Sequence, residues 1–119
     1  MITIFSSAQR TATANSVEFT LDGKRGARFY LNITTATAGT LDMKIQSKCP
    51  LADTWIDVPG AVFAQKSAAG LDDLLVCPGI TDTANESVAD NLQNQVLKAV
   101  ATMASSPDMV FSLSAIPLD

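Results

Sequence analysis

Apolar and polar residues alternate with a period of two through long stretches of this chain. The pattern is clearest in ARFYLNITT (residues 27–35) and in LDMKIQ (residues 41–46), and it returns in DMVFSLSA (residues 108–115). Because side chains two residues apart on a β-strand point to the same face, each stretch predicts a strand with one buried face. We expect a single core to contain the apolar residues of the first two stretches: Phe29, Leu31, Ile33, Leu41, Met43 and Ile45.

Glycine and proline stand at the ends of the alternating stretches, where they favour turns. Between these turns we expect short strands, spaced roughly every 8–12 residues, which is typical of a β-sandwich or barrel. The chain is therefore predicted to be all-β. The expected strands are Ile2–Phe5 at an edge, Val17–Leu21, the stretches 27–35 and 41–46, Trp55–Val58 as far as Pro59-Gly60, Ala61–Gln65, Leu71–Gly79, and a last strand from Met109 that Pro117 ends; Ser47–Thr54 is the expected hairpin loop, with the strand ending before Pro50.

The segment 81–105 permits two structures. Its apolar residues at positions 88, 92, 96 and 100 are spaced by four, which is typical of a helix that Ser87 could cap. Alternation between positions 95 and 103 permits instead a loop through Asn91 followed by a strand over Gln95–Met103. On the local pattern alone the helix is favoured, and the strand remains the alternative.

The N-terminal segment SSAQRTATANS (Ser6–Ser16) has no apolar periodicity, which is typical of an extended arm or a long loop. We therefore divide the chain into an N-terminal arm with an edge strand (residues 1–16) and a β-sandwich domain (residues 17–119), and expect the domain to fold without the arm. An ordered arm must lie on its own domain or on a neighbouring subunit. Arg10 is the arm's single charge and could pair with an acidic group of a neighbour; the candidate partner-binding residues of the arm are Arg10, Thr11, Thr13 and Asn15.

The chain of 119 residues carries little charge, since charged residues make up 17% and apolar residues 47%. A weakly charged surface suits contact with another protein, although a small, mildly apolar monomer has the same composition. The net charge of −4 argues against a nucleic-acid partner, whose phosphates require clustered lysine and arginine. No apolar run approaches the roughly 18 residues of a membrane span, and no signal peptide is visible, so we expect no membrane partner and an unprocessed product made in the cytoplasm.

The sequence contains no histidine, which excludes Ser–His–Asp and Cys–His catalytic arrangements. The adjacent carboxylates of Asp72 and Asp73 would point to opposite faces of a strand, and the scattered glycines form no phosphate-binding loop. Cys49 and Cys77 cannot complete a zinc site by themselves, and whether they pair is left open. We therefore expect no enzyme, no catalytic residue, no metal and no cofactor.

Trp55 is the single tryptophan, and its position permits three roles. It could be a platform for stacking a sugar, a surface anchor for a protein partner, or a cross-strand residue packed into the wall of the domain. An exposed Trp55 beside Tyr30 would favour carbohydrate binding, whereas a buried Trp55 would weaken that interpretation.

Motifs along nearly the whole chain resemble a family of small virion proteins of tailed bacteriophages. The arm AQRTATANS (residues 8–16) is similar to the family's Ala-Arg-Thr-Ala-Thr-x-Asn-Ser, and KRGARFYLNITTA (residues 24–36) to its Gly-Arg-Gly turn and the strand that follows. Three further segments resemble the family: TLDMKIQSKCP (residues 40–50), TWIDVPGA (residues 54–61) and CPGITDTANESVADNL (residues 77–92). After Leu92 the chain departs from it, because relatives carry a Pro-Arg-x-Trp-Arg-Val-x-Val strand where this chain has QNQVLKAVATMAS.

The resemblance implies a β-sandwich, jelly-roll-like, that is a structural part of the virion, and it favours the strand over the helix after Asn91. The best-fitting role is a capsid decoration (cement) protein, which binds the outer capsid surface and stabilises the shell. Its partners would be the major capsid protein and further copies of itself, with a trimer favoured among the homo-oligomers. The alternative is a carbohydrate-binding or receptor-binding module on the surface of the head or tail.

Overall fold

The computed structural model describes all 119 residues and contains strands, turns and loops but no helix. All strands belong to one hydrogen-bonded sheet in the order β1-β7-β3-β5-β6, with β2 paired to β7 and β4 paired to β3. The prediction of an all-β fold is confirmed. The strands are β1 (Ile2–Arg10), β2 (Ala14–Asn15), β3 (Gly26–Cys49), β4 (Thr54–Val62), β5 (Gly70–Val76), β6 (Ser87–Val88) and β7 (Leu97–Leu118).

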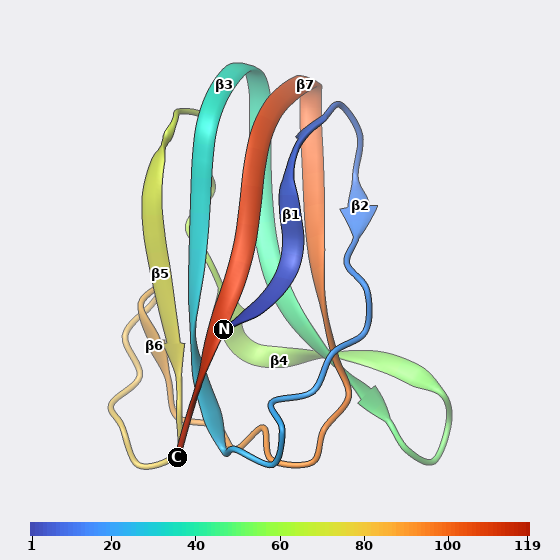
Figure 1. The fold of residues 1–119 in the computed structure, drawn as a ribbon, viewed down its shortest axis with the longest axis vertical. Helices are drawn as coiled ribbons and strands as arrows, with labels where there is room; N and C mark the ends of the chain where they lie inside the picture. The colour runs from blue at the N-terminus through green and yellow to red at the C-terminus, as the bar shows by residue number, and fades with distance from the viewer.

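Strands β3 and β7 form a long antiparallel ribbon that runs from the pair Gly26–Leu118 to the pair Ser47–Leu97. At the top of Figure 1 both strands bend over, β3 passing from the front of the molecule to the back and β7 from the back to the front. The ribbon therefore contributes to two facing layers, and the single sheet folds into a β-sandwich. It is jelly-roll-like in the sense that one folded antiparallel ribbon forms the centre of both layers.

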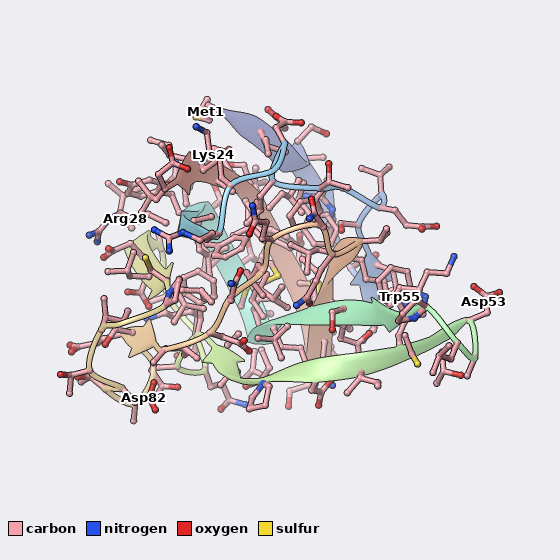
Figure 2. All side chains as sticks on the ribbon, turned by 90° about the horizontal axis from the view of Figure 1, so that it is seen from below. Met1, Lys24, Arg28, Asp53, Trp55 and Asp82 are labelled. Carbon is pink, nitrogen blue, oxygen red and sulfur yellow. The ribbon has the colours of Figure 1, made fainter.

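The two layers divide the strands unequally. The front layer, nearer the viewer in Figure 1, consists of β1, the part of β7 from Met109 onward, the part of β3 up to Ala38, β5 and β6. The back layer consists of β2, the part of β7 up to Ala104, the part of β3 from Thr40 onward, and β4. Figure 2 shows the same sandwich from below.

Gly39 makes the corner at which β3 passes from one layer to the other. Its φ is +85°, and an added Cβ would lie 2.4 Å from the Cα of Pro107 and 2.6 Å from the carbonyl oxygen of Ala104. The corner thus requires glycine both for its backbone conformation and for the close approach of β7. The sequence predicted a turn between two strands here, but the pairing with β7 continues on both sides of Gly39, so β3 is one bent strand.

The core lies between the layers and includes all six residues predicted from the alternation, each at most 3% exposed. The other half of the ribbon supplies a matching row, because the odd-numbered residues of β7 also point inward. These inward residues of β7 are Leu97, Ala99, Ala101, Met103, Met109, Phe111, Leu113 and Ala115. Because the odd-numbered residues of both long strands point inward, the folded ribbon fills the interior from both layers.

The helix interpretation of 81–105 is wrong, and the alternative of a loop followed by a strand is confirmed. Strand β7 begins at Leu97, two residues after the expected start, and its first half pairs with β3 in the back layer. The preceding loop is not loose, since Leu92 is fully buried and its N–H donates to the carbonyl of Arg25 at 2.7 Å. Pairing with β3 overrides the local helical pattern.

Other strand boundaries also differ from the predictions; β5, for example, covers Gly70–Val76 and not Leu71–Gly79. Val17–Leu21 is not a strand. The backbone of Ser16 bonds to Ala99 and that of Phe19 to Leu97, so the segment advances three residues while β7 advances two, and the regular pairing is broken. Val17 is left 69% exposed. Strand β4 continues through Pro59-Gly60, which lie in a bulge. From Lys44 to Gln46 the register moves two residues along β3 but five along β4, from Val62 to Asp57. Pro117 does not end the last strand but lies within β7. Strand β1 begins opposite Ala115, so beyond that residue β7 has no neighbour on the β1 side, and a proline without an N–H is tolerated there.

The N-terminal segment lies along its own domain, which is one of the two surfaces that the sequence left open for it. Residues 2–10 form β1 against β7, with register shifts at Thr3–Phe5 and Phe5–Ala8, and β2 pairs with the opposite half of β7. Ile4 and Phe5 are buried at 4% and 5% exposure. Strand β1 is therefore an integral edge of the front layer (Figure 1).

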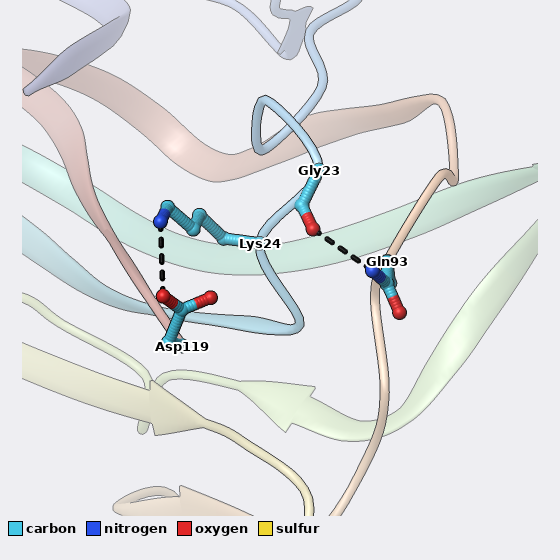
Figure 3. Close-up of polar contacts among 4 residues, drawn as sticks. All are labelled: Gly23, Lys24, Gln93 and Asp119. Carbon is cyan, nitrogen blue, oxygen red and sulfur yellow. Dashed lines mark hydrogen bonds and ion pairs between the residues drawn. The ribbon is translucent and has the colours of Figure 1, made fainter.

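The loop Asp22–Gly26 is fastened at the lower end of the sandwich (Figure 3). The ammonium of Lys24 lies 3.0 Å from a carboxylate oxygen of Asp119, and the side-chain amide of Gln93 donates to the carbonyl of Gly23 at 3.1 Å. These contacts join three segments that are distant in the sequence. The charge of Lys24 is thus paired within the domain.

Candidate functional site

Arg10 is engaged by its own domain. Its guanidinium lies over the rings of Phe5 and Phe111, at 4.9 and 4.6 Å from their centroids. It donates to the carbonyls of Phe111 and Ser6, both at 2.9 Å, and to that of Ala8 at 3.2 Å. Burial lowers the pKa of Arg10 from its ordinary value. The side chain therefore covers the edge of the core beneath β1, and three of its five N–H donors bond to backbone carbonyls.

The other arm residues of the predicted site fall into two groups. The hydroxyl of Thr13 accepts from the N–H of Met103 at 3.0 Å and donates to the carbonyl of the same residue at 3.3 Å, so it fixes the chain between β1 and β2. Thr11 and Asn15 are exposed and make no side-chain hydrogen bond within the domain. Of the four candidates, these two remain accessible to a partner.

Trp55 stands on β4, opposite Lys48 in the register, and is half-buried. Lysine ammonium groups lie over its ring: that of Lys98 at 4.6 Å from the centroid and that of Lys48 at 5.9 Å. Tyr30 belongs to the front layer, whereas Trp55 belongs to a hairpin of the back layer, so the two rings do not form a common platform. This geometry disfavours a sugar-stacking site and makes Trp55 part of a cross-strand cluster.

The β3–β4 hairpin extends sideways beyond the body of the sandwich, at the lower right of Figure 1, and Figure 2 shows Asp53 near its tip. Two apolar side chains of the hairpin are left in solvent: Leu51 is 95% exposed and Ile56 is 54% exposed. Strand β3 ends before Pro50, as the sequence predicted, but the turn is shorter than the expected loop Ser47–Thr54, because Ser47–Cys49 still pair with β4. The hairpin thus presents an apolar tip away from the core.

Ion pairs hold this hairpin in place. The ammonium of Lys48 lies 2.8 Å from a carboxylate oxygen of Asp53 in the turn and 3.7 Å from one of Glu18, which belongs to the segment beside β7. The hydrogen bond with Asp53, together with both negative charges, raises the pKa of Lys48. With Lys98 over Trp55, these contacts brace the hairpin from the turn, from β7 and from the Glu18 segment.

The outward face of the back layer is rich in charge. Asp57 accepts from the side-chain amide of Gln46 at 2.8 Å and lies 3.0 Å from the ammonium of Lys44, and these two contacts lower the pKa of Asp57. We call this surface the back face; its outward side chains are Asp42, Lys44, Gln46 and Lys48 of β3, Trp55 and Asp57 of β4, and Lys98, Val100 and Thr102 of β7.

The outward face of the front layer carries little charge. Its charged residues, Arg28 and Asp73, form an ion pair with each other, and Asp108 at the upper rim accepts from the side-chain amide of Gln9. Tyr30, which is 39% exposed, lies opposite Ser114 and Asp73. We call this surface the front face; its outward side chains are Thr3 of β1, Arg28, Tyr30, Asn32 and Thr34 of β3, Leu71, Asp73 and Leu75 of β5, and Ser112, Ser114 and Ile116 of β7.

Sequence reasoning missed both surfaces as candidate sites, although their signal was present. The same alternation that identified the core also lists the residues on the opposite side of each strand, such as Tyr30, Asn32, Ser112 and Ser114. What the sequence could not supply is the pairing of β3 with β7 and β5, which places these residues side by side.

The groups that could carry chemistry are dispersed. Both cysteines are free thiols, one at the hairpin and one after β5. No three His, Cys, Asp or Glu side chains come close enough to hold a metal ion, and no helix is long and apolar enough to cross a membrane. The largest cavity, of about 370 Å³, is an open groove beside Leu31 and Ile33, and the ion pair between Lys66 and Asp72, 2.7 Å apart, lies at its rim.

Comparison with known proteins gives no match to a family model, to a curated protein or to a solved structure.

Proposed function

We propose that this protein is a virion structural protein of a tailed bacteriophage, a decoration (cement) protein that binds the outer capsid surface and stabilises the shell. The observation that carries the proposal is the braced β3–β4 hairpin, which projects sideways from a compact sandwich with Leu51 bare at its tip. The motifs that resemble small virion proteins support the same role.

A projecting hairpin on a rigid body suits a protein that joins neighbouring subunits. While the sandwich rests on one shell subunit, the hairpin can contact the next one, so separation of the two subunits must break both contacts. Bracing by Lys48 and Lys98 fixes the hairpin before binding, which reduces the entropy lost when it docks. Many copies on one shell add their effects.

The partner in this role is the major capsid protein, and the site of action is the outer surface of the capsid. Shells have rotation axes at which identical subunits meet, and closed cyclic symmetry favours a trimer of this protein around such an axis. Neither nucleic acid nor membrane takes part in the proposed contact.

Binding to capsids tests the proposal. Capsids of the encoding phage, purified from particles that lack this protein, would be mixed with increasing amounts of it and sedimented. We expect saturable binding at a fixed number of copies per capsid and a higher melting temperature for the decorated capsids. A protein that stays in the supernatant at all concentrations, or that binds without raising the melting temperature, would contradict the proposal.

A further inference from the structure

The two outward faces of the sandwich differ sharply in charge. The back face carries five charged side chains, namely Asp42, Lys44, Lys48, Asp57 and Lys98. The front face carries Arg28 and Asp73, which neutralise each other, and Asp108 at its upper rim; it is otherwise built from hydroxyl, amide, aromatic and aliphatic side chains. Both faces belong to the same ribbon, so the difference reflects the residues chosen at the outward positions and not the type of strand.

A face of this kind suits burial against another protein. The centres of protein interfaces are depleted in lysine, glutamate and aspartate and enriched in tyrosine. Tyr30 stands at the middle of the front face, with Ser114 of β7 on one side and Asp73 of β5 on the other. Covering the centre of this face would desolvate one ion pair, Arg28–Asp73, whereas covering the back face would desolvate five charged side chains.

The size of the front face argues against a second copy of this chain as its occupant. Residues 28 to 34 of β3 span roughly 20 Å along the strand, and the four strands β1, β7, β3 and β5 span roughly 15 Å across. The face therefore covers on the order of 300 Å², whereas each partner in a stable one-to-one complex buries about 800 Å². Two copies joined through this face alone would separate in dilute solution, but a shell that also binds the hairpin would retain them.

We infer that the front face is the surface that lies against the capsid shell, and that its partner is a flat, weakly charged protein surface of the major capsid protein. The inference rests on the proposed function and adds the orientation: the front face is covered by the shell, and the back face with its lysines and carboxylates remains in solvent. The hairpin belongs to the back layer and projects sideways, so it extends parallel to the shell at the height of that layer, where Leu51 meets a neighbouring subunit that rises beside the sandwich.

A matched pair of substitutions on β7 tests this orientation. Ser112 points outward from the front face and Thr102 from the back face, and both are small hydroxyl residues in the same strand. Ser112→Lys places a charge in the proposed contact, and Thr102→Lys places the same charge on the solvent side. Both variants would be titrated against the purified capsids that lack this protein. Tyr30→Lys, at an exposed position, serves as a second front-face variant if Ser112→Lys melts below the wild type.

We expect Ser112→Lys or Tyr30→Lys to weaken capsid binding at least about tenfold, since the new charge must be desolvated, and Thr102→Lys to bind within about twofold of the wild type. If the wild type binds capsids and the front-face variants bind them equally well, the orientation is overturned and the proposed function stands. A wild type that binds no capsid would overturn the proposed function itself. A wild-type dimer that Ser112→Lys converts to a monomer, with capsid binding unchanged, would identify a second copy as the occupant and also overturn the inference.

Discussion

Arg10 shows how one charged side chain can close the edge of a β-sandwich. Its guanidinium covers Phe5 and Phe111 and bonds to the backbone on both sides of the β1–β7 seam. Replacement by methionine keeps some apolar cover but removes these hydrogen bonds and the contact between cation and rings. We predict a loss of about 2 kcal/mol in the free energy of unfolding, measured by urea denaturation.

Arg10→Lys is the matched control, because lysine keeps the charge but lacks the planar fork that reaches several carbonyls. Its loss should fall between those of the wild type and Arg10→Met. If both variants unfold within about 0.5 kcal/mol of the wild type, Arg10 does not stabilise the edge, and a role in binding a partner becomes the better explanation.

Gly39 at the corner of β3 gives a second prediction at this scale. An alanine there would adopt a left-handed conformation and would also collide with Pro107 and Ala104. Gly23 is the natural control, since its φ is +81° but nothing lies within 4 Å of an added Cβ. Gly39→Ala should therefore lower the free energy of unfolding by about 1–3 kcal/mol more than Gly23→Ala does. Equal losses for the two variants would mean that the corner relaxes easily.

Strand β1 changes the expected result of an N-terminal truncation. The sequence predicted that the domain would fold without its arm, but Ile4 and Phe5 are in the core and β1 pairs with β7. Removing residues 1–10 exposes apolar surface worth about 3–6 kcal/mol, which approaches the whole stability of a small domain. We predict a protein that aggregates or melts far below the full-length chain in a thermal scan.

The double variant Thr11→Ala, Asn15→Ala is a control for that truncation, because both side chains are exposed and free of hydrogen bonds within the domain. It should melt with the wild type. A truncated protein that melts within about 3 °C of the full-length one would show that β1 is dispensable for folding and would restore the arm as a candidate for bridging.

The hairpin can be tested separately from the fold. Leu51 is 95% exposed, so Leu51→Asp should change the free energy of unfolding by less than about 0.5 kcal/mol. If the tip inserts between shell subunits, the same variant should bind capsids more weakly and raise their melting temperature less than the wild type. Val17→Asp, at a position that is 69% exposed and outside the hairpin, should leave both quantities unchanged. Equal effects of the two substitutions would remove the hairpin from the contact.

Local patterns predicted which faces of the strands are buried but not how the strands meet. Period-two alternation assigned the core residues of β3 correctly, because burial on one face imposes that period wherever the strand lies. The spacing of four at positions 88 to 100 was ambiguous, since four is close to one helical turn and is also a multiple of two. In fact Val100 has the outward phase of β7, Val96 directly precedes that strand, and Leu92 is buried from a loop.

The features that could not be predicted from the sequence depend on pairing between strands that are distant in the chain. The bend at Gly39 is continuous because β7 bends beside it at Ser105 and Ser106, which both have positive φ. Likewise, the charge-poor front face exists because β5 and β7 flank β3, and no local window contains all three strands. Pairing over such sequence separations is decided by the whole fold.

At the scale of the molecule, one ribbon forms the centre of both layers and connects two faces of different chemistry. Pairing along almost the whole length of β3 and β7 ties the front face to the back face, so a load applied to one layer is carried by the other. A rigid body with one weakly charged face, one charged face and a lateral hairpin suits a protein that lies on a shell and faces solvent.

The most direct test of the proposed role and orientation is a cryo-EM reconstruction of capsids saturated with the protein, compared with one of capsids that lack it. We predict extra density on the outer surface into which the sandwich fits with Tyr30 and Ser112 toward the shell, Lys44 and Lys98 toward solvent, and Leu51 over a neighbouring subunit. Absence of ordered extra density would contradict the proposed role, and density on the shell with the back face against it would contradict the proposed orientation.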